Sequence, residues 1–212
     1  MTADALPAGD VAAWYAEMSA ALQGSGDSDV PCGGCTACCR SSQFVHIAAD
    51  ERSTLAVIPT ALLFPAPRLP RGHVLLGYDE RGHCPMLVES GCSIYDNRPR
   101  ACQTYDCRVF AATGVLPSDK PAVAERVRHW RFSFDHPDSR PLFEALQAAA
   151  ASLDQLPPEL APPTDTGRAV VAVQIVDLFL QRDETGGLTV VEPAPGEVRD
   201  AVARLSALRV SG

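Results

Sequence analysis

Helical spacing of apolar residues characterises the start and the last third of the chain. After Asp10, apolar residues recur every three or four positions, at Val11, Trp14, Tyr15, Met18 and Leu22. This pattern predicts a helix whose N-cap is Asp10. The same spacing predicts helices at residues 121–130, 139–153 and 196–208. Residues 168–181 fit a helix or a buried strand equally well, and residues 188–192 are expected to form a strand after the turn sequence DETGG.

The middle of the chain has shorter apolar segments, separated by polar and proline-rich ones. We expect a strand at residues 43–48, a helix at residues 50–57 capped by Asp50, and irregular structure at the prolines between residues 59 and 70. Residues 73–95 alternate short apolar segments with turns, as in a small hairpin or irregular sheet. Residues 100–112 can form a helix. The pattern predicts an α+β fold: an irregular, cysteine-rich, metal-centred core with short strands, packed with several α-helices.

Three segments are expected from this pattern. Residues 1–31 form an N-terminal helix and linker, residues 32–118 a cysteine-cluster domain, and residues 119–212 a mainly helical region packed on it. The reason for the packing is that the apolar stripes of the last region need a partner. A separately folding C-terminal domain is the alternative.

Composition and charge exclude several classes of protein. The longest apolar run, at residues 169–180, contains Gln174 and Asp177 and is shorter than the roughly 18 residues of a membrane span. The N-terminus lacks the positive charge and apolar stretch of a secretory signal, so we expect a cytoplasmic protein without a membrane segment. A net charge of −8 argues against nucleic acid as a partner.

Eight cysteines carry the chemistry of the sequence, and all of them lie between Cys32 and Cys107. Thiols in a reducing cytosol are metal ligands more often than disulfides, whereas an exported chain would favour four disulfides. The first group is the C-x2-C-x2-C-C run CGGCTACC, and the second is spread more widely. The predicted ligands are Cys32, Cys35, Cys38, Cys39, Cys84, Cys92, Cys102 and Cys107.

The spacing leaves the sharing of these thiols open. Two sites of four thiolates, one joined cluster, or one site with spare reactive thiols all fit. Adjacent side chains tend to diverge, so Cys38 and Cys39 are expected to serve different metals, or one to be a ligand and the other a bridging thiol or a thiol beside the ligands. A vicinal disulfide is the alternative. On a continuous helix Cys102 and Cys107 would lie roughly 140° apart, so their convergence on one metal requires a break in that helix.

The metal is an iron–sulfur cluster or zinc. The C-x2-C-x2-C run with the distant Cys84–Pro85 pair hints at an iron–sulfur cluster, but C-x2-C pairs are equally typical of zinc sites. Charge does not decide, because four thiolates around Zn²⁺ or a [4Fe–4S]²⁺ core both leave −2. Next to the cysteines, Arg98 can donate to sulfur or to Asp96, Tyr95 can form part of an apolar lid, and His83 can be a ligand or a hydrogen-bond donor.

The segments CGGCTACC, HCPML and GCSIYDNRPRAC resemble the bacterial CxxCxxCC family of YkgJ-like cysteine-cluster proteins, described as zinc- or iron-chelating domains. The resemblance covers roughly residues 30–110 and implies metal chelation by all eight cysteines. Flagellin lysine N-methylases resemble this family in carrying such a cluster.

Three functions follow, in order of preference. The first is a metal-cluster protein with a redox or electron-transfer role, and the second is a zinc-stapled domain that binds a protein partner or stores metal. The third is a protein related to the lysine methylases; it ranks last because no G-x-G-x-x-G or other methyl-donor motif is present. No H-E-x-x-H and no nucleophile with a convincing partner occurs, so the sequence identifies no catalytic residue.

Overall fold

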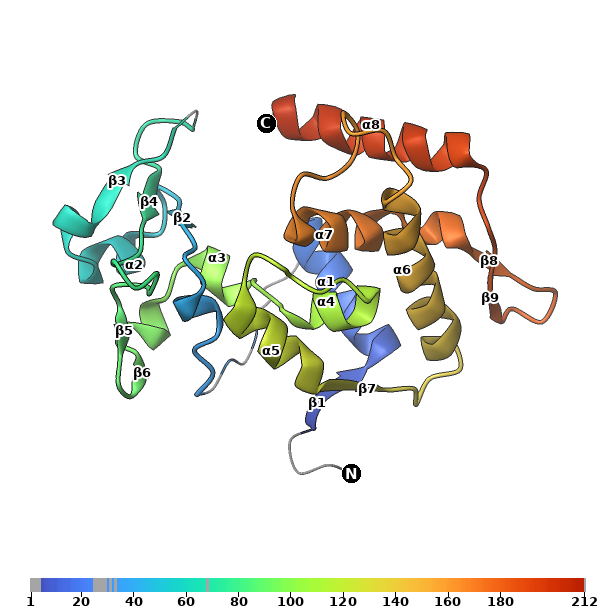
Figure 1. The fold of residues 1–212 in the computed structure, drawn as a ribbon, viewed down its shortest axis with the longest axis horizontal. Coiled ribbons are helices and arrows are strands. Elements are labelled where there is room, and N and C mark those ends of the chain that lie inside the picture. Colours follow the sequence, from blue (N-terminus) through green and yellow to red (C-terminus); the bar gives the residue numbers. More distant parts are fainter. Residues whose placement is uncertain (1–4, 25–29, 31, 33, 68, 212) are drawn as a thin grey trace. The chain divides into compact units, whose positions relative to one another are not determined.

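The computed structural model describes residues 5–24, 30, 32, 34–67 and 69–211, and it divides into two compact units (Figure 1). Unit 1 comprises Met1–Gly26, Cys107–Asp119 and Val127–Gly212, and unit 2 comprises Asp27–Asp106 and Lys120–Arg126. The N-terminal helix therefore belongs to the same unit as the C-terminal region. The three-segment division expected from the sequence stays a prediction.

Unit 1 is mainly helical. Its helices are α1 (Val11–Leu22), α4 (Arg108–Thr113), α6 (Ser139–Leu153), α7 (Asp165–Ile175), the 3-10 helix η4 (Val176–Phe179) and α8 (Pro195–Ser211). Its strands are β1 (Leu6–Asp10), β7 (Trp130–Ser133), β8 (Leu180–Arg182) and β9 (Leu188–Val190). Strands β1 and β7 pair in parallel, and β8 and β9 form an antiparallel hairpin. The helix α5 (Pro121–His129) contributes residues to both units.

The core of unit 1 is formed by helix α6, which packs against α1, α4 and α7. The largest fully buried side chains there include Trp14, Phe110 and Leu146. Asp10 ties this core to the β1–β7 pair, because its carboxylate caps α1 at the N–H of Ala12 (3.0 Å) and accepts a hydrogen bond from the Ser139 hydroxyl (2.7 Å). One side chain thus fixes the starts of α1 and α6.

Unit 2 has little regular structure. Its strands are β2 (Val45–Ile47), β3 (Leu63–Pro65), β4 (Val74–Leu76), β5 (Leu87–Val88) and β6 (Gly91–Cys92). Its helices are η1 (Cys38–Arg40), α2 (Arg52–Val57), η2 (Thr60–Leu62), η3 (Tyr95–Asn97) and α3 (Arg100–Gln103). The sheet has the order β2–β4–β3, and β5 and β6 form a separate hairpin. A small cluster of Ile47, Ile58 and Leu76 is buried between the sheet and α2.

Most predicted elements are confirmed, including the α+β class, the helix capped by Asp10 and the turn between β8 and β9. The predicted cap of α2 is wrong, since the N-cap residue is Glu51 rather than Asp50. The two readings of residues 168–181 both apply in part: α7 ends at Ile175, and β8 begins at Leu180. No helix in the described part of the chain is long and apolar enough to cross a membrane.

The single helix predicted at residues 100–112 is wrong. It is divided into α3 and α4, and the physical reason lies in the hydrogen bonds at the end of α3. The last helical bond of α3 joins the N–H of Thr104 to the carbonyl of Arg100 (3.0 Å), and the Gln103 carbonyl accepts from the N–H of Val30 (2.8 Å). The Gln103 carbonyl is therefore bonded to a distant segment at the point where a continuous helix would use it.

Candidate metal centre

Seven of the eight cysteines line one cavity in unit 2. Its volume is about 50 Å³, far below the 300–1,000 Å³ of pockets that hold organic ligands. The lining cysteines are Cys32, Cys35, Cys38, Cys39, Cys84, Cys92 and Cys102, and the other lining residues are Leu76, Met86, Ile94, Tyr95, Arg98 and Pro99. All eight cysteines of the chain are free thiols of intermediate exposure.

The first group of cysteines follows a tight path. The N–H of Cys35 donates to the carbonyl of Cys32 at 2.9 Å, which turns the chain back on itself. Cys38 and Cys39 then begin the 3-10 helix η1. Their side chains were expected to diverge, yet both line the same cavity, so the groups of four are not kept apart at this pair.

The second group is joined to the first by backbone contacts. The N–H of Cys84 donates to the carbonyl of Cys39 at 2.7 Å, and the N–H of Ser42 donates to the carbonyl of Gly82 at 2.9 Å. Gly82 has a φ of +77°, and a Cβ at this position would lie 2.2 Å from Ser42 Oγ. A Cβ at Gly82 would require the Ser42 hydroxyl to move and would strain the left-handed backbone, so glycine favours the approach that brings the two cysteine groups together.

In the β5–β6 hairpin, Cys92 pairs with Leu87. Leu87 lies three residues after Cys84 in the chain. In both Cys84 and Cys92 the sulfur accepts a backbone hydrogen bond from the residue two positions later, Met86 and Ile94 respectively. Burial raises the pKa of both thiols, and these N–H groups oppose the rise because they stabilise the thiolate. Such N–H donors favour the deprotonated form that metals bind.

Cys102 and Arg98 reach the cavity from α3 and the residues before it. The N–H of Cys102 donates to the carbonyl of Pro99 at 2.8 Å, within the first turn. Arg98 is 7% exposed; its Nη1 donates to the Tyr95 carbonyl (2.9 Å), and its guanidinium lies 4.0 Å from the centroid of the Tyr95 ring. A buried positive charge thus lines the same cavity as seven thiols.

The pKa values of the thiols that line this cavity are shifted in different directions. Burial raises the pKa of Cys102 to about 12 and also raises that of Cys32, where the charge of Arg98 opposes the increase. A hydrogen bond from the Cys38 thiol lowers the pKa of Cys39 to about 7, and the same bond raises the pKa of Cys38. This hydrogen bond therefore favours the thiolate at Cys39 over the thiolate at Cys38.

The eighth cysteine, Cys107, belongs to unit 1 and is the N-cap residue of α4. Its sulfur accepts a hydrogen bond from the indole N–H of Trp130, with 3.2 Å between Nε1 and Sγ. Trp130 lies at the start of β7, a strand that the sequence pattern did not reveal. An isolated tryptophan at residue 130 offered no local signal for this contact, because the two residues are distant in sequence.

Of the residues predicted beside the cysteines, Tyr95 and Arg98 line the cavity, and the structure places His83 elsewhere. The backbone N–H of His83 donates to Asp79 Oδ1 at 2.8 Å, and its side chain does not line the cavity. Sequence reasoning missed Leu76 and Met86. The position of Met86 within HCPML, two residues after Cys84, was the available signal, and Leu76 was recognisable only as one residue of an apolar segment.

The donor set fits a thiophilic metal, since seven sulfurs, backbone N–H donors and a buried guanidinium surround one small space. Soft thiolates suit zinc and iron–sulfur clusters, and they disfavour the hard cations that prefer oxygen. Within the residues that the structure describes, no three side chains of His, Cys, Asp or Glu are placed closely enough to hold a single metal ion. The thiols line a shared space without forming a tetrahedral site in it.

Comparison with protein families gives one match. Residues 31–119 match the model of the CxxCxxCC family, whose description is "Putative zinc- or iron-chelating domain". The match ends before α5 and covers the segment that contains all eight cysteines. No curated protein and no solved structure matches the chain. The family match and the donor set of the cavity both support metal chelation, and both rest on the same cysteines.

Proposed function

We propose that the chain is a metalloprotein in which the cysteines of unit 2 hold one shared iron–sulfur centre with a redox or electron-transfer role. The observation that carries the proposal is the single cavity lined by seven cysteines. Two independent four-thiolate zinc sites would give two separate groups of sulfur atoms. The ligands are drawn from Cys32, Cys35, Cys38, Cys39, Cys84, Cys92 and Cys102. Cys107, which the sequence pattern also predicts as a ligand, belongs to unit 1.

The surroundings of the thiols support a redox role. When bound, an iron–sulfur cluster supplies a one-electron couple, whose potential depends on hydrogen bonds to sulfur, nearby charge and solvent exposure. Backbone N–H groups donate to the sulfurs of Cys84 and Cys92, and the buried Arg98 guanidinium supplies a nearby charge. An apolar lining that includes Leu76 limits the access of solvent. Free thiols of this number also suit a reducing compartment such as the cytoplasm.

Anaerobic purification tests the proposal. We expect a brown protein with broad visible absorption, bleached by dithionite, that contains iron and acid-labile sulfide. The matched variant is Cys102→Ser, which removes one lining thiol at the first turn of α3. This variant should lose iron and sulfide together. If its iron and sulfide contents are unchanged, Cys102 is not a ligand of the centre.

A zinc-stapled domain that binds a protein partner or stores metal is the second candidate, and one observation favours it. Among the described residues from 30 to 106, only five aliphatic side chains are buried: Val30, Ile47, Ile58, Ala66 and Leu76. A core this small stabilises few domains of that length, and structural metals are a common substitute for it. A colourless protein with stoichiometric zinc would establish this candidate and overturn the iron–sulfur proposal.

Metal removal gives a second readout for both candidates. Chelation under reducing conditions should lower the hydrogen-exchange protection of unit 2, because the small cluster around Ile47 does not replace the metal–sulfur bonds. Unit 1 has its own buried helical core and should keep its protection. Equal protection of unit 2 with and without metal would contradict a folding role for the centre.

A further inference from the structure

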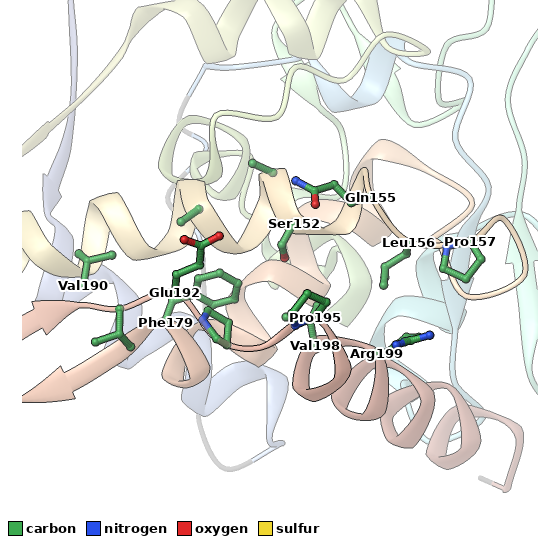
Figure 2. A pocket seen from close by; sticks show the side chains of 14 residues that line it. Ser152, Gln155, Leu156, Pro157, Phe179, Val190, Glu192, Pro195, Val198 and Arg199 are labelled. Carbon is green, nitrogen blue, oxygen red and sulfur yellow. The ribbon is translucent and has the colours of Figure 1, made fainter.

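A second cavity lies in unit 1, in the region that the family match does not cover. It has a volume of about 590 Å³ and lies between α6, α8 and the segment that joins β9 to α8 (Figure 2). Its walls are mainly apolar and include Leu156, Pro157, Phe179, Val190, Pro195 and Val198. The volume falls within the 300–1,000 Å³ typical of pockets for small organic molecules.

Two charged side chains of opposite sign line this cavity. Figure 2 shows the Glu192 carboxylate beside Phe179 and the Arg199 side chain on the other side of Pro195 and Val198. Both residues are exposed, and the side chain of neither makes a hydrogen bond or ion pair with the residues that the structure describes. The two charges therefore remain available at separate places along an apolar groove.

Two other charged residues of unit 1, Glu197 and Arg168, have structural partners, whereas exposed residues such as Glu184 and Arg204 resemble Glu192 and Arg199 in pairing with none of the described residues. Glu197 accepts a hydrogen bond from the N–H of Ala194 (2.8 Å) and so caps α8, and Arg168 pairs with Asp154. The amide of Gln155 adds a neutral polar group to the lining. The groove thus combines an apolar body with one anionic, one cationic and one amide contact.

We propose that this groove binds a short peptide of apolar residues with free ends. Its ammonium group pairs with Glu192, its carboxylate pairs with Arg199, and its side chains cover Phe179 and Val198. The opposite charges of Glu192 and Arg199 complement a molecule that carries both signs, and the cavity volume lies in the range of small organic ligands, which fits a peptide of two or three residues. The proposal is independent of the metal centre, because all lining residues belong to unit 1.

Three forms of one probe test the proposal: the dipeptide Leu-Phe, its N-acetyl form and its C-terminal amide. Isothermal titration calorimetry on the full metal-loaded chain should show the free dipeptide binding about two- to fivefold more tightly than either blocked form, as expected for one solvent-accessible ion pair at each end. Equal affinities of all three forms, or no binding of the dipeptide up to its solubility limit, would overturn it.

Two substitutions make the test specific. Glu192→Gln should abolish the preference for the free amine over the acetyl group and keep the preference for the carboxylate over the amide. Arg199→Gln should give the reverse pattern. The matched controls are Glu184→Gln on the β8–β9 turn and Arg204→Gln on α8, which are exposed and do not line the groove. Loss of the same preference in a control variant would contradict the assignment.

A steric variant addresses the apolar part of the groove. Ala151 is exposed on α6 and lines the groove, so Ala151→Trp should fill it without disturbing the core and lower dipeptide affinity at least about tenfold. Thermal unfolding verifies that the variant is folded. Unchanged affinity in a folded Ala151→Trp protein would show that the dipeptide binds elsewhere. If the variant does not fold, the opposite end-group preferences expected for Glu192→Gln and Arg199→Gln still test the proposal.

Discussion

The indole N–H of Trp130 donates a hydrogen bond to the sulfur of Cys107, and both residues belong to unit 1. The other seven cysteines line a single cavity in unit 2. Cys107 therefore has a protein partner of its own, although it lies only five residues after Cys102 in the chain. This difference allows the contribution of Cys107 to be measured separately.

We predict a graded loss of metal in two matched variants. Cys102→Ser removes a thiol from the shared cavity and should lower the metal content by half or more, because metal–thiolate sites depend on each ligand. Cys107→Ser leaves the seven lining thiols intact and should lower it less. Mass spectrometry after anaerobic purification measures the metal content per chain of both variants. Equal losses in the two variants would mean that all eight cysteines act as one ligand set.

The second prediction concerns Gly82, which has no ligand atom of its own. Gly82→Ala should destabilise unit 2 and lower its metal content, because the new Cβ meets Ser42 Oγ and separates Cys84 from Cys39. The left-handed backbone alone costs about 1–2 kcal/mol for a residue with a Cβ. Unfolding in urea, together with metal analysis, measures both effects.

Gly186→Ala is the control for this substitution. Gly186 has a similar φ of +86°, but a Cβ there would meet nothing within 4 Å, and the residue lies in unit 1. It should cost only the backbone strain and leave the metal content unchanged. If both variants retain metal equally, the close approach of Gly82 to Ser42 is not needed for the centre.

The third prediction tests the charge of Arg98. Its guanidinium opposes the burial-induced rise in the pKa of Cys32 and Cys92. Arg98→Leu should therefore weaken metal retention about tenfold in competition with a chelator, a typical cost for a residue next to metal ligands. Arg98→Lys keeps the charge and should recover part of this loss. Equal weakening in both variants would indicate that stacking on Tyr95 matters rather than charge.

The sequence predicted the structural features that depend on residues close together in the chain. The cap formed by Asp10 and the helices α1 and α6 follow from local spacing and capping chemistry. The closeness of the first group, from Cys32 to Cys39, was predictable too, because short C-x2-C spacings restrict where sulfur atoms can point, but the sequence left open whether the two groups share one site. A break between Cys102 and Cys107 was identified as the condition for their convergence on one metal. The break is present, but the sequence could not show that the Gln103 carbonyl bonds to Val30 there, and only Cys102 lines the cavity.

Contacts between distant segments were not predictable in this way. Strand β1 contains Pro7 and Gly9, which are unfavourable in strands, and it forms only because β7 pairs with it from more than one hundred residues away. The roles of Leu76 and Trp130 depend on the same kind of non-local pairing. The cavity lined by Glu192 and Arg199 likewise depends on residues of α6, α8 and the segment between β9 and α8 lying around one space, which no motif encodes.

The last prediction concerns Asp10 and the acid stability of unit 1. Burial opposes the ionised carboxylate, but hydrogen bonds from the Ser139 hydroxyl and from the N–H groups of His136, Ala13 and Asp135 lower the pKa of Asp10 to about 2. An unfolded Asp has a pKa of about 3.9, so this carboxylate stabilises the fold fully above roughly pH 5. The stabilisation is lost as the pH falls towards 2, because the folded state must then protonate Asp10.

Asp10→Ala should therefore lower the free energy of unfolding by about 0.5–2 kcal/mol at pH 7, the usual cost of losing an N-cap. Its difference from the unmodified protein should shrink as the pH falls from about 5 towards 2, and urea unfolding across this range measures it. Asp200→Asn, an exposed carboxylate on α8, is the control and should show a small difference at every pH. A difference for Asp10→Ala that stays constant down to pH 2 would show that the ionised carboxylate does not stabilise unit 1.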